Sequence, residues 1–342
     1  MEYANIQTIR YMGNKNRLLN FVIPEIESVS NPGDVICDIM AGTHSIGYAL
    51  KERNVVYAND IQYYSYVIGK SLLGNYQIPT IEMAHNDLDN LINLNIKNKE
   101  FDFFEKNYAD TYFSKEQCCE IDNLRFAIEK QLDIDKKNFY LTILMSVMCK
   151  AQSTTGHFAQ YLPKDHRRVE ILRKIEIYEN FFKKIEDFDN FKLSNYDNRV
   201  YNLDYKELFK QEEIKDVKCF YLDSPYTTDQ YSRFYHLLET VCKYDYPKLN
   251  HKAKYREDRA MSDFCYKKSV ANEFDNIIKF AKKNKSSLII SYSNHGVISI
   301  EEIEDIARKY YQKVSVKYMS YEHSSQGKGV ININEVIIKL EI

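Results

Sequence analysis

A glycine-bearing turn near residue 42, set between a short apolar segment and a helical segment, constrains the fold of this chain more than any other feature. Residues 34–39 are mostly apolar and predict a buried strand that ends at the turn Ala41-Gly42-Thr43-His44-Ser45-Ile46-Gly47. A helical pattern continues to about residue 53, and residues 55–58 predict a second strand. Strand, turn, helix and strand in this order begin an α/β doubly wound sheet.

A helical region interrupts this pattern. Residues 81–185 are rich in Lys, Glu, Asn and Phe at helical spacing, and residues 139–145 are their most apolar part, which predicts a buried helix. A length of 342 residues with 44% hydrophobic residues is sufficient for one large core and a second unit. We therefore expect a cofactor-binding and catalytic domain made of residues 1–80 and 200–342, with a mostly helical target-recognition insertion at residues 81–199.

Strand patterns return after the helical region. Residues 217–222 and 287–292 are apolar runs of strand length. The alternating segments 314–318 and 330–339 flank Gly327-Lys328-Gly329, which predicts a hairpin. The expected fold class is therefore α/β, with a Rossmann-like mixed sheet that ends in an antiparallel C-terminal hairpin and with a helical insertion domain.

Composition and charge exclude several classes of protein. The net charge of −2 means that any nucleic-acid-binding surface must be local. The seven cysteines include no C-x-x-C pair, which predicts reduced thiols in a cytosolic protein, and the eight histidines lack metal-ligand spacing. No apolar run approaches the ~18 residues of a membrane span, and the N-terminus lacks the apolar stretch of a signal peptide. We expect no metal site and no membrane association.

The glycine-bearing turn indicates a nucleotide-type ligand, because glycines let the backbone approach the ligand and the following helix offers unpaired N–H groups. In the dinucleotide pattern G-x-G-x-x-G, His44 occupies the middle glycine position, where a pyrophosphate would meet the backbone. NAD and FAD are therefore disfavoured, and with them a nicotinamide oxidoreductase, whereas S-adenosylmethionine has no pyrophosphate. Asp60 follows the second strand, where an acidic residue either binds ribose hydroxyls or caps the next helix.

A second motif, Asp223-Ser224-Pro225-Tyr226, follows the predicted strand at residues 217–222. A carboxylate at the carboxyl end of a strand lies where α/β sheets place their active sites. The Asp223 carboxylate and the Ser224 carbonyl could each accept one N–H of an adenine amino group while Tyr226 stacks on the base. The nitrogen lone pair would then point at a methyl donor, so catalysis would come from positioning and electrostatics. Taken alone, the tetrapeptide is also compatible with an ordinary turn at the end of a strand.

Together these segments resemble the N6-adenine DNA methyltransferases of the DNA adenine methylase family. The family's Y/W-x-G-x-K loop matches Tyr11-Met12-Gly13-Asn14-Lys15, its F/M-A-G-T-x-S-x-G turn matches residues 40–47, and its D-P-P-Y motif matches residues 223–226. Residues 223–240 are similar to a subgroup with D-P-P-Y-T-x-x-Q-Y and Y-H-L-L-E-T. The resemblance covers nearly the whole chain except about residues 81–145, and it implies a methyltransferase fold that uses S-adenosylmethionine as cofactor.

The resemblance also implies roles for individual residues. The implied cofactor-binding residues extend from the methionine end of the cofactor to its ribose and adenine: Tyr11, Gly13, Asn14, Lys15, Asp38, Ala41, Gly42, Thr43, Gly47, Asp60 and Asp204. The implied catalytic residues are Asp223, Ser224, Pro225 and Tyr226. Ser224 departs from the family, which nearly always has Pro there. Because the functional atom is a backbone carbonyl, we expect activity to survive, although reduced or lost activity stays open.

Three segments are candidates for contact with DNA. The candidate residues are Tyr231, Arg233, Tyr235 and His236 after the tetrapeptide, Lys254, Arg256 and Arg259 within residues 252–259, and Arg167 and Arg168 within residues 164–168. Basic and aromatic side chains of this kind suit contacts to phosphates and to an extruded base. Without the resemblance, each segment reads as a solvated helix face or as core. With it, we favour DNA contact for the first two segments, whereas residues 164–168 fit both interpretations equally.

These observations predict a site-specific methyltransferase that moves a methyl group from S-adenosylmethionine to the N6 amino group of an adenine flipped out of double-stranded DNA, with the insertion reading the bases. We expect a monomeric bacterial protein of the cytoplasm, associated with the nucleoid. It would work in a restriction–modification pair with a cognate endonuclease encoded nearby, or as a solitary methylase. Two alternatives stay open: an RNA adenine methyltransferase, and a catalytically silent DNA-binding relative.

Overall fold

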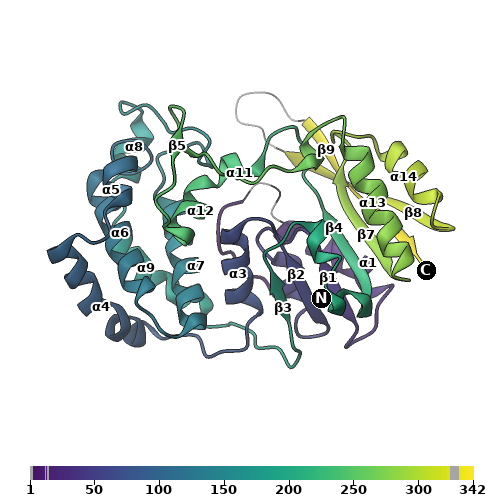
Figure 1. Cartoon of the computed structure of the whole chain (residues 1–342), viewed down its shortest axis with the longest axis horizontal. Coiled ribbons are helices and arrows are strands. Elements are labelled where there is room, and N and C mark those ends of the chain that lie inside the picture. Colours follow the sequence, from purple (N-terminus) through teal and green to yellow (C-terminus); the bar gives the residue numbers. More distant parts are fainter. Residues whose placement is uncertain (1–2, 12, 14, 324–330) are drawn as a thin grey trace.

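A seven-stranded sheet, in the order β3-β2-β1-β4-β7-β9-β8, organises the two ends of the chain (Figure 1). The structure is a computed structural model that describes residues 3–11, 13, 15–323 and 331–342, and only the backbone of residues 320–323 and 331–334. The strands are β1 (Val35–Asp38), β2 (Val55–Asn59), β3 (Arg199–Tyr201), β4 (Val217–Asp223), β7 (Ser287–Ser293), β8 (Lys313–His323) and β9 (Ile331–Glu341).

The sheet is parallel except at one edge. Strands β3, β2, β1, β4 and β7 run parallel, while β9 pairs antiparallel with both β7 and β8. The expected α/β fold with an antiparallel C-terminal hairpin is therefore confirmed. Strand β3 was not predicted, because three partly exposed residues carry no periodic signal. The predicted hairpin turn Gly327-Lys328-Gly329 lies outside the described residues.

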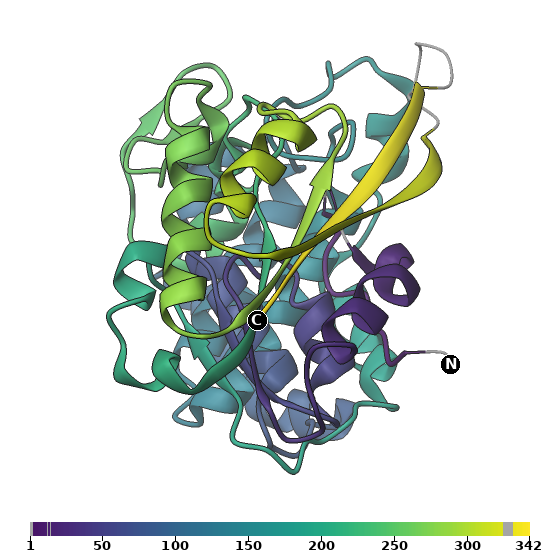
Figure 2. The ribbon, with the colours of Figure 1, turned by 90° about the vertical axis from the view of Figure 1, so that its right-hand side faces the viewer.

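The parallel strands are apolar at successive positions because helices cover both faces of the sheet. In β4, Cys219 and Tyr221 face the cluster that contains α1 (Leu19–Glu27) and α2 (Ser45–Leu50). Phe220 and Leu222 face the opposite cluster, which contains α10 (Tyr205–Leu208), α13 (Val270–Lys283) and α14 (Ile300–Arg308). Figure 2 shows α1 and α13 on opposite sides of the strands.

The segment between β2 and β3 is helical. Its helices are α3 (Tyr63–Leu73), α4 (Ile81–Asn98), α5 (Phe103–Tyr108), α6 (Lys115–Glu129), α7 (Ile134–Ala151), α8 (Arg167–Leu172), α9 (Ile177–Lys184) and the short η2 (Ile185–Phe188). Side-chain oxygens cap three of the helix beginnings: Thr80 caps α4, Ser114 forms a capping box with Gln117 at α6, and Asp133 caps α7. The expected buried helix at residues 139–145 lies within α7.

A third core cluster joins these helices to the sheet through α3. It also takes in α11 (Tyr231–Phe234) and α12 (His236–Lys243), which follow β4 in the sequence. A small hairpin of β5 (Leu249–Asn250) and β6 (Tyr255–Arg256) lies against α12. Residues 231–256 thus pack with the helical unit, although the sequence groups them with the sheet. The division into residues 1–80 with 200–342 and residues 81–199 stays a prediction.

The chain order places a topological switch between β1 and β4. From β1 the chain builds outward through β2 and β3, and it then returns to form β4 on the other side of β1. In open α/β sheets the loops diverge at this point and leave a crevice at the carboxyl ends of the strands. The remaining short helices, η1 (Lys15–Leu18), η3 (Glu212–Asp216) and η4 (Asp263–Cys265), lie in the connections. Among the described residues, no helix combines the length and the apolar character needed to cross a bilayer.

Candidate functional site

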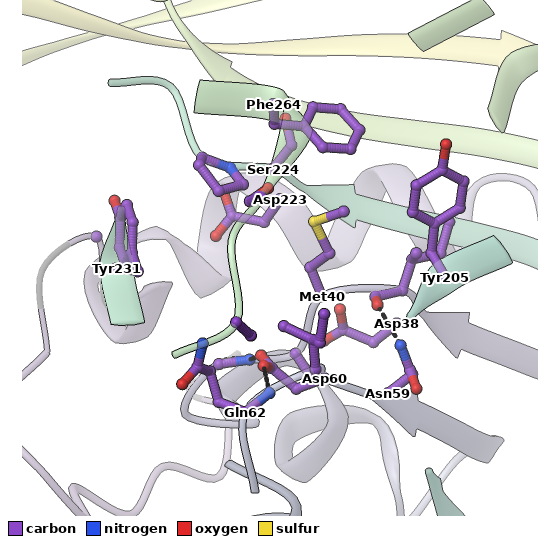
Figure 3. Close-up of a pocket in the computed structure, with 18 of the residues that line it drawn as sticks. Asp38, Met40, Asn59, Asp60, Gln62, Tyr205, Asp223, Ser224, Tyr231 and Phe264 are labelled. Carbon is purple, nitrogen blue, oxygen red and sulfur yellow. Dashed lines mark hydrogen bonds between the residues drawn. The ribbon is translucent and has the colours of Figure 1, made fainter. Parts of the chain in front are cut away.

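A cavity opens at this switch point, at the carboxyl ends of β1, β2 and β4 (Figure 3). Segments distant in the sequence supply its lining: Tyr11, Gly13 and Lys15, residues 38–43 and 45–46, residues 59–62 and 203–205, Tyr221 and residues 223–226, residues 230–232 and 260–264, and Glu273. The structure therefore brings together all four predicted catalytic residues and most of the predicted cofactor-binding residues. Asn14 lies outside the described residues.

The glycine-bearing turn is held from behind by α3. Gly42 has a φ of +52°, and a Cβ atom there would lie 3.3 Å from the Tyr11 ring, so only glycine fits without strain. The Ser65 hydroxyl donates to the Gly42 carbonyl over 2.7 Å. His44 is fully buried with Nε2 2.8 Å from the Ser65 carbonyl, and its burial lowers its pKa to about 4. His44 is therefore a structural residue of the turn, and it does not line the cavity.

Asp60 holds the backbone of two segments that line the cavity, and its predicted contact with ribose hydroxyls stays a prediction. Its Oδ2 accepts the Gly42 N–H over 2.9 Å, and its Oδ1 accepts the Gln62 N–H over 2.8 Å at the beginning of α3. The same carboxylate lines the cavity. Burial raises its pKa to about 6, although these two N–H groups act in the opposite direction. Asp60 thus fixes the turn against α3 and still presents lone pairs to a ligand.

Asp38, at the end of β1, is a buried polar group of the cavity. Its side chain is buried, and its Oδ1 has no hydrogen-bond partner among the described residues. Burial, then the nearby Asp223 and Asp60 carboxylates, raises the pKa of Asp38 well above its usual value. A buried acceptor without a partner is costly, so this oxygen indicates a ligand that brings a hydrogen-bond donor or a positive charge.

The tetrapeptide and the N-terminal loop meet in an ion pair. Asp223 ends β4, and its Oδ1 lies 3.0 Å from Nζ of Lys15, which is buried. Burial raises the pKa of Asp223 to about 6, although the Lys15 ammonium opposes this shift. The sequence assigned Lys15 to the cofactor, whereas its ammonium lies on the Asp223 carboxylate. Ser224 is buried, and its hydroxyl has no partner among the described residues.

Aromatic rings border the cavity beside this pair. A Cβ atom at Gly13, which has a φ of +76°, would lie 3.5 Å from the Tyr226 hydroxyl. Tyr11 stacks on Tyr235 with ring centroids 4.5 Å apart, and Tyr231 lies 5.8 Å from Tyr11. Tyr226 and Tyr231 both line the cavity, so two flat faces are available close to Asp223.

Several predicted site residues have other partners. The fully buried His236 ring has Nε2 3.0 Å from the Phe158 carbonyl, and burial lowers its pKa to about 3. Arg256 is 1% exposed and forms ion pairs with Asp245 at 2.6 Å and Asp258 at 2.9 Å. Tyr235 is buried against Tyr11. These three side chains are buried in this structure, and their contact with DNA stays a prediction.

Gly47 also has a packing role. It lies within α2 and does not line the cavity, and a Cβ atom there would lie 3.2 Å from Val56. Gly47 lets α2 pack closely on β2, and its predicted contact with the cofactor stays a prediction.

The other candidate DNA contacts remain at the surface or partly so. Arg233 pairs with Asp229 at 2.9 Å, and its side chain is 41% exposed. Arg259 donates from Nε to the Arg256 carbonyl, and its guanidinium lies 5.0 Å from the centroid of the Tyr255 ring. Lys254 is half-buried and donates to the Asn107 carbonyl. The last two, Arg167 and Arg168, begin α8, where Arg167 is exposed and Arg168 is half-buried.

The sequence missed part of the lining. Ile61, Leu203 and Phe264 supply apolar surface, and no local motif distinguishes them from core residues. The sequence also missed Glu335 on β9, which lies outside this lining but has its Oε2 3.6 Å from Nζ of Lys15. Within the described residues, no group of three or more His, Cys, Asp or Glu side chains could hold a metal ion.

The α/β fold, the glycine-bearing turn and the tetrapeptide at residues 223–226 together define an adenine methyltransferase. Comparison with known families agrees. The model of the D12 class N6 adenine-specific DNA methyltransferase family matches residues 11–307. This chain belongs to that family, so the resemblance inferred from the motifs is confirmed.

Three relatives are named methylases. Modification methylase LlaI of Lactococcus lactis subsp. lactis is 29% identical and aligns with 96% of this chain and 54% of its own length. Type II methyltransferase M.FokI of Planomicrobium okeanokoites is 28% identical, with 92% and 50% covered. Type II methyltransferase M.NlaIII of Neisseria lactamica is 28% identical, with 92% of each chain covered. The chain thus spans about half the length of the first two.

Proposed function

We propose that this protein transfers a methyl group from S-adenosylmethionine to the N6 amino group of an adenine that is flipped out of double-stranded DNA. The observation that carries the proposal is one cavity in which the Asp223 carboxylate, paired with Lys15, lies close to Asp38, whose Oδ1 has no hydrogen-bond partner among the described residues. One acidic group suits an adenine amino group, and the other suits a charged cofactor. Membership of the family of adenine-specific methyltransferases supports the same chemistry.

The residues present fit the cofactor. Asp38 would accept hydrogen bonds from its ammonium group, and Asp60 would accept them from its ribose hydroxyls. Ile61, Leu203 and Phe264 offer apolar surface for its adenine, with Asp204 at the edge of the cavity. When bound, S-adenosylmethionine supplies an electrophilic methyl group. Gly42, Thr43 and Ala41 belong to the turn along which its backbone would lie.

The tetrapeptide would hold the target base. The Asp223 carboxylate accepts one N–H of the adenine amino group and the Ser224 carbonyl accepts the other, so the nitrogen lone pair points towards the methyl group. Tyr226 stacks on the base, with Pro225 fixing the backbone between them. Lys15 keeps Asp223 ionised and in place. The chain thus contributes positioning and electrostatic stabilisation. Its contacts with the base also offset the few kcal/mol needed to unstack it.

DNA would lie across the mouth of the cavity, between the sheet and the helical unit. Tyr231 is suited to contact the extruded base or the space that it leaves. Arg233, Arg259 and Lys254 lie on the segments next to the cavity and would contact phosphates. Arg167 and Arg168 extend this basic surface onto the helical unit, which we propose as the reader of base sequence.

The biological setting follows from the relatives, whose names identify them as modification methylases or type II methyltransferases. We propose that this protein modifies host DNA in a bacterial restriction–modification system, with a cognate endonuclease as its genetic partner. A monomer acting in the cytoplasm, near the nucleoid, is sufficient for this task, because every proposed catalytic group comes from one chain.

Transfer of label tests the proposal. Purified protein is incubated with tritiated S-adenosylmethionine and unmethylated bacterial DNA, beside an Asp223→Ala variant. We expect tritium in N6-methyladenine, reduced about 100-fold or more in the variant, and sequencing of the product gives the recognition site. Label that enters structured RNA and not duplex DNA would favour an RNA methyltransferase. Cofactor binding with no label in either substrate would indicate a catalytically silent DNA-binding protein.

A further inference from the structure

Lys15 lies between two carboxylates that come from different strands of the sheet, Asp223 at the end of β4 and Glu335 on β9. Its buried ammonium lies 3.0 Å from Oδ1 of Asp223 and 3.6 Å from Oε2 of Glu335. Glu335 belongs to β9, where it faces Ser293 of β7 and Met319 of β8 in the antiparallel part of the sheet. A residue of the C-terminal hairpin therefore reaches the site that the parallel strands build.

Among the described residues, Lys15 is the only ion-pair partner of the Glu335 carboxylate. Its side chain is 12% exposed, and its Oε2 is buried without a hydrogen-bond partner among the described residues. The ammonium of Lys15 is its close charged neighbour. The two carboxylates together outweigh burial and raise the pKa of Lys15 above its usual value.

The charge balance of this group differs from that of a simple ion pair. Lys15 and Asp223 alone would form a neutral pair, in which the ammonium competes with any other donor for the Asp223 oxygens. A second carboxylate draws the ammonium partly away and leaves a net charge of −1 on the group of three. An acceptor that carries net negative charge binds a donor with developing positive charge more strongly, and it does so most in a site that excludes water.

We propose that Glu335 is a positioning residue for methyl transfer, which holds Lys15 so that the group of Lys15, Asp223 and Glu335 stays net negative beside the reacting amino group. This inference rests on the proposed function. Positive charge develops on the adenine nitrogen as the methyl group arrives, and the net negative group stabilises it. The same charge favours a cationic ligand over a neutral one in the cofactor half of the cavity.

Binding of two inert cofactor analogues tests the charge directly. S-adenosylhomocysteine has a neutral thioether, whereas sinefungin carries a protonated amine in place of the reacting group. Their dissociation constants are measured by titration calorimetry for the wild-type protein, Glu335→Gln and the control Glu341→Gln, a carboxylate on the same strand that pairs with Lys339 instead of Lys15. In Glu335→Gln we expect sinefungin to bind roughly tenfold more weakly, while S-adenosylhomocysteine changes by less than about twofold.

A purely structural role for Glu335 predicts a different result. Both analogues would then weaken together, or neither would change, and either result would overturn the inference. Glu335→Asp keeps the charge on a shorter side chain, so it should recover most of the preference for sinefungin. Thermal unfolding of each variant shows whether the protein remains folded, and the Asp variant keeps the test meaningful if the Gln variant does not fold.

Single-turnover methylation separates this inference from the proposed function. Glu335→Gln should slow methyl transfer by about 10- to 100-fold at saturating cofactor and DNA, with the dissociation constant for DNA unchanged. If the wild-type protein methylates DNA and Glu335→Gln does so equally fast, only the inference about Glu335 fails. If the wild-type protein prefers sinefungin but methylates nothing, the proposed function fails while the charge effect stands. If it binds neither analogue, both fail.

Discussion

At the scale of single residues, three carboxyl groups in one cavity have different roles because their neighbours differ. Asp223 faces the Lys15 ammonium, Asp60 accepts two backbone N–H groups, and one oxygen of Asp38 has no partner among the described residues. Burial raises the pKa of all three. A site of this composition attracts cations and polarised N–H groups, and its activity depends on which carboxyl groups are ionised.

The pKa of Asp223 predicts how methyl transfer depends on pH. Only the ionised carboxylate accepts an N–H on either oxygen, and its pKa is raised to about 6. Falling pH protonates Asp223 and removes that acceptor, so the rate should decline below about pH 6 and level off above it. The measurement is a single-turnover rate at saturating cofactor, across about pH 5 to about pH 8. A rate that stays constant through this range would exclude Asp223 as the acceptor.

Asp60 has a similar pKa of about 6, so a control must separate the two groups. Protonation of Asp60 should weaken cofactor binding, whereas protonation of Asp223 should slow the reaction of bound cofactor. The dissociation constant of S-adenosylhomocysteine is therefore measured over the same pH range. In Glu335→Gln the rate profile should shift to lower pH, because a negative neighbour that raises the pKa of Asp223 has been removed.

The unusual Ser224 gives a second prediction at this scale. Its hydroxyl is buried without a partner among the described residues, which costs free energy, and the proposed acceptor is its backbone carbonyl. Ser224→Ala should therefore raise the free energy of unfolding by about 1 kcal/mol and change the methylation rate by less than about threefold. Ser224→Pro restores the usual family residue and should likewise remain active. A tenfold loss in Ser224→Ala would show that the hydroxyl participates.

At the scale of elements, apolar runs and turn residues identified β1, β2, β4, β7 and the C-terminal hairpin, because these signals are local. Features that depend on register or burial were missed. Glu335 reaches Lys15 only because β9 pairs with β7, and no sequence pattern reveals that pairing. Arg256 resembled a DNA contact in sequence, yet Asp245 and Asp258 hold it inside the protein. The order of the motifs therefore predicted which segments line the cavity, but it did not predict the ion-pair partners of Glu335 and Arg256.

Helix α3 supports the glycine-bearing turn, which gives a prediction for Gly69. A Cβ atom at Gly69 would lie 2.4 Å from Cε1 of His44 and 2.7 Å from Val200. Alanine favours a helix over glycine by about 1 kcal/mol, but this contact should reverse the sign. Gly69→Ala should lower the free energy of unfolding by about 1 to 3 kcal/mol and weaken cofactor binding, because His44 belongs to the turn.

Chemical denaturation and calorimetric titration with S-adenosylhomocysteine measure these two effects. Lys70→Ala, one position further along the same helix and half-exposed, is the matched control and should leave cofactor affinity unchanged. A Gly69→Ala variant that is more stable than the wild type and binds the cofactor normally would contradict the proposed role of α3.

At the scale of the whole molecule, the helical unit and the sheet are joined by shared core. The cluster of the helices α4 to α7 and α9 continues through Tyr64 and Val67 of α3 and through Leu238 and Val241 of α12. Helix α3 also supports the glycine-bearing turn. Neither side could separate without exposing apolar side chains, so cofactor binding and the helical unit are expected to depend on one another.

This shared core predicts one cooperative unfolding transition. Leu144 of α7 lies in the helical cluster and Ile290 of β7 lies in a sheet cluster, and both are fully buried. Leu144→Ala and Ile290→Ala should each cost about 2 to 5 kcal/mol, and each should move the whole transition, seen by calorimetry and by loss of S-adenosylhomocysteine binding alike. Leu132→Ala, at a fully exposed position, should move neither signal. Leu144→Ala could instead split the transition in two and leave cofactor binding with the transition at the higher temperature. The helical unit would then be an independent domain. In that case residues 81–199 could be exchanged between relatives to change DNA specificity without altering the catalytic site.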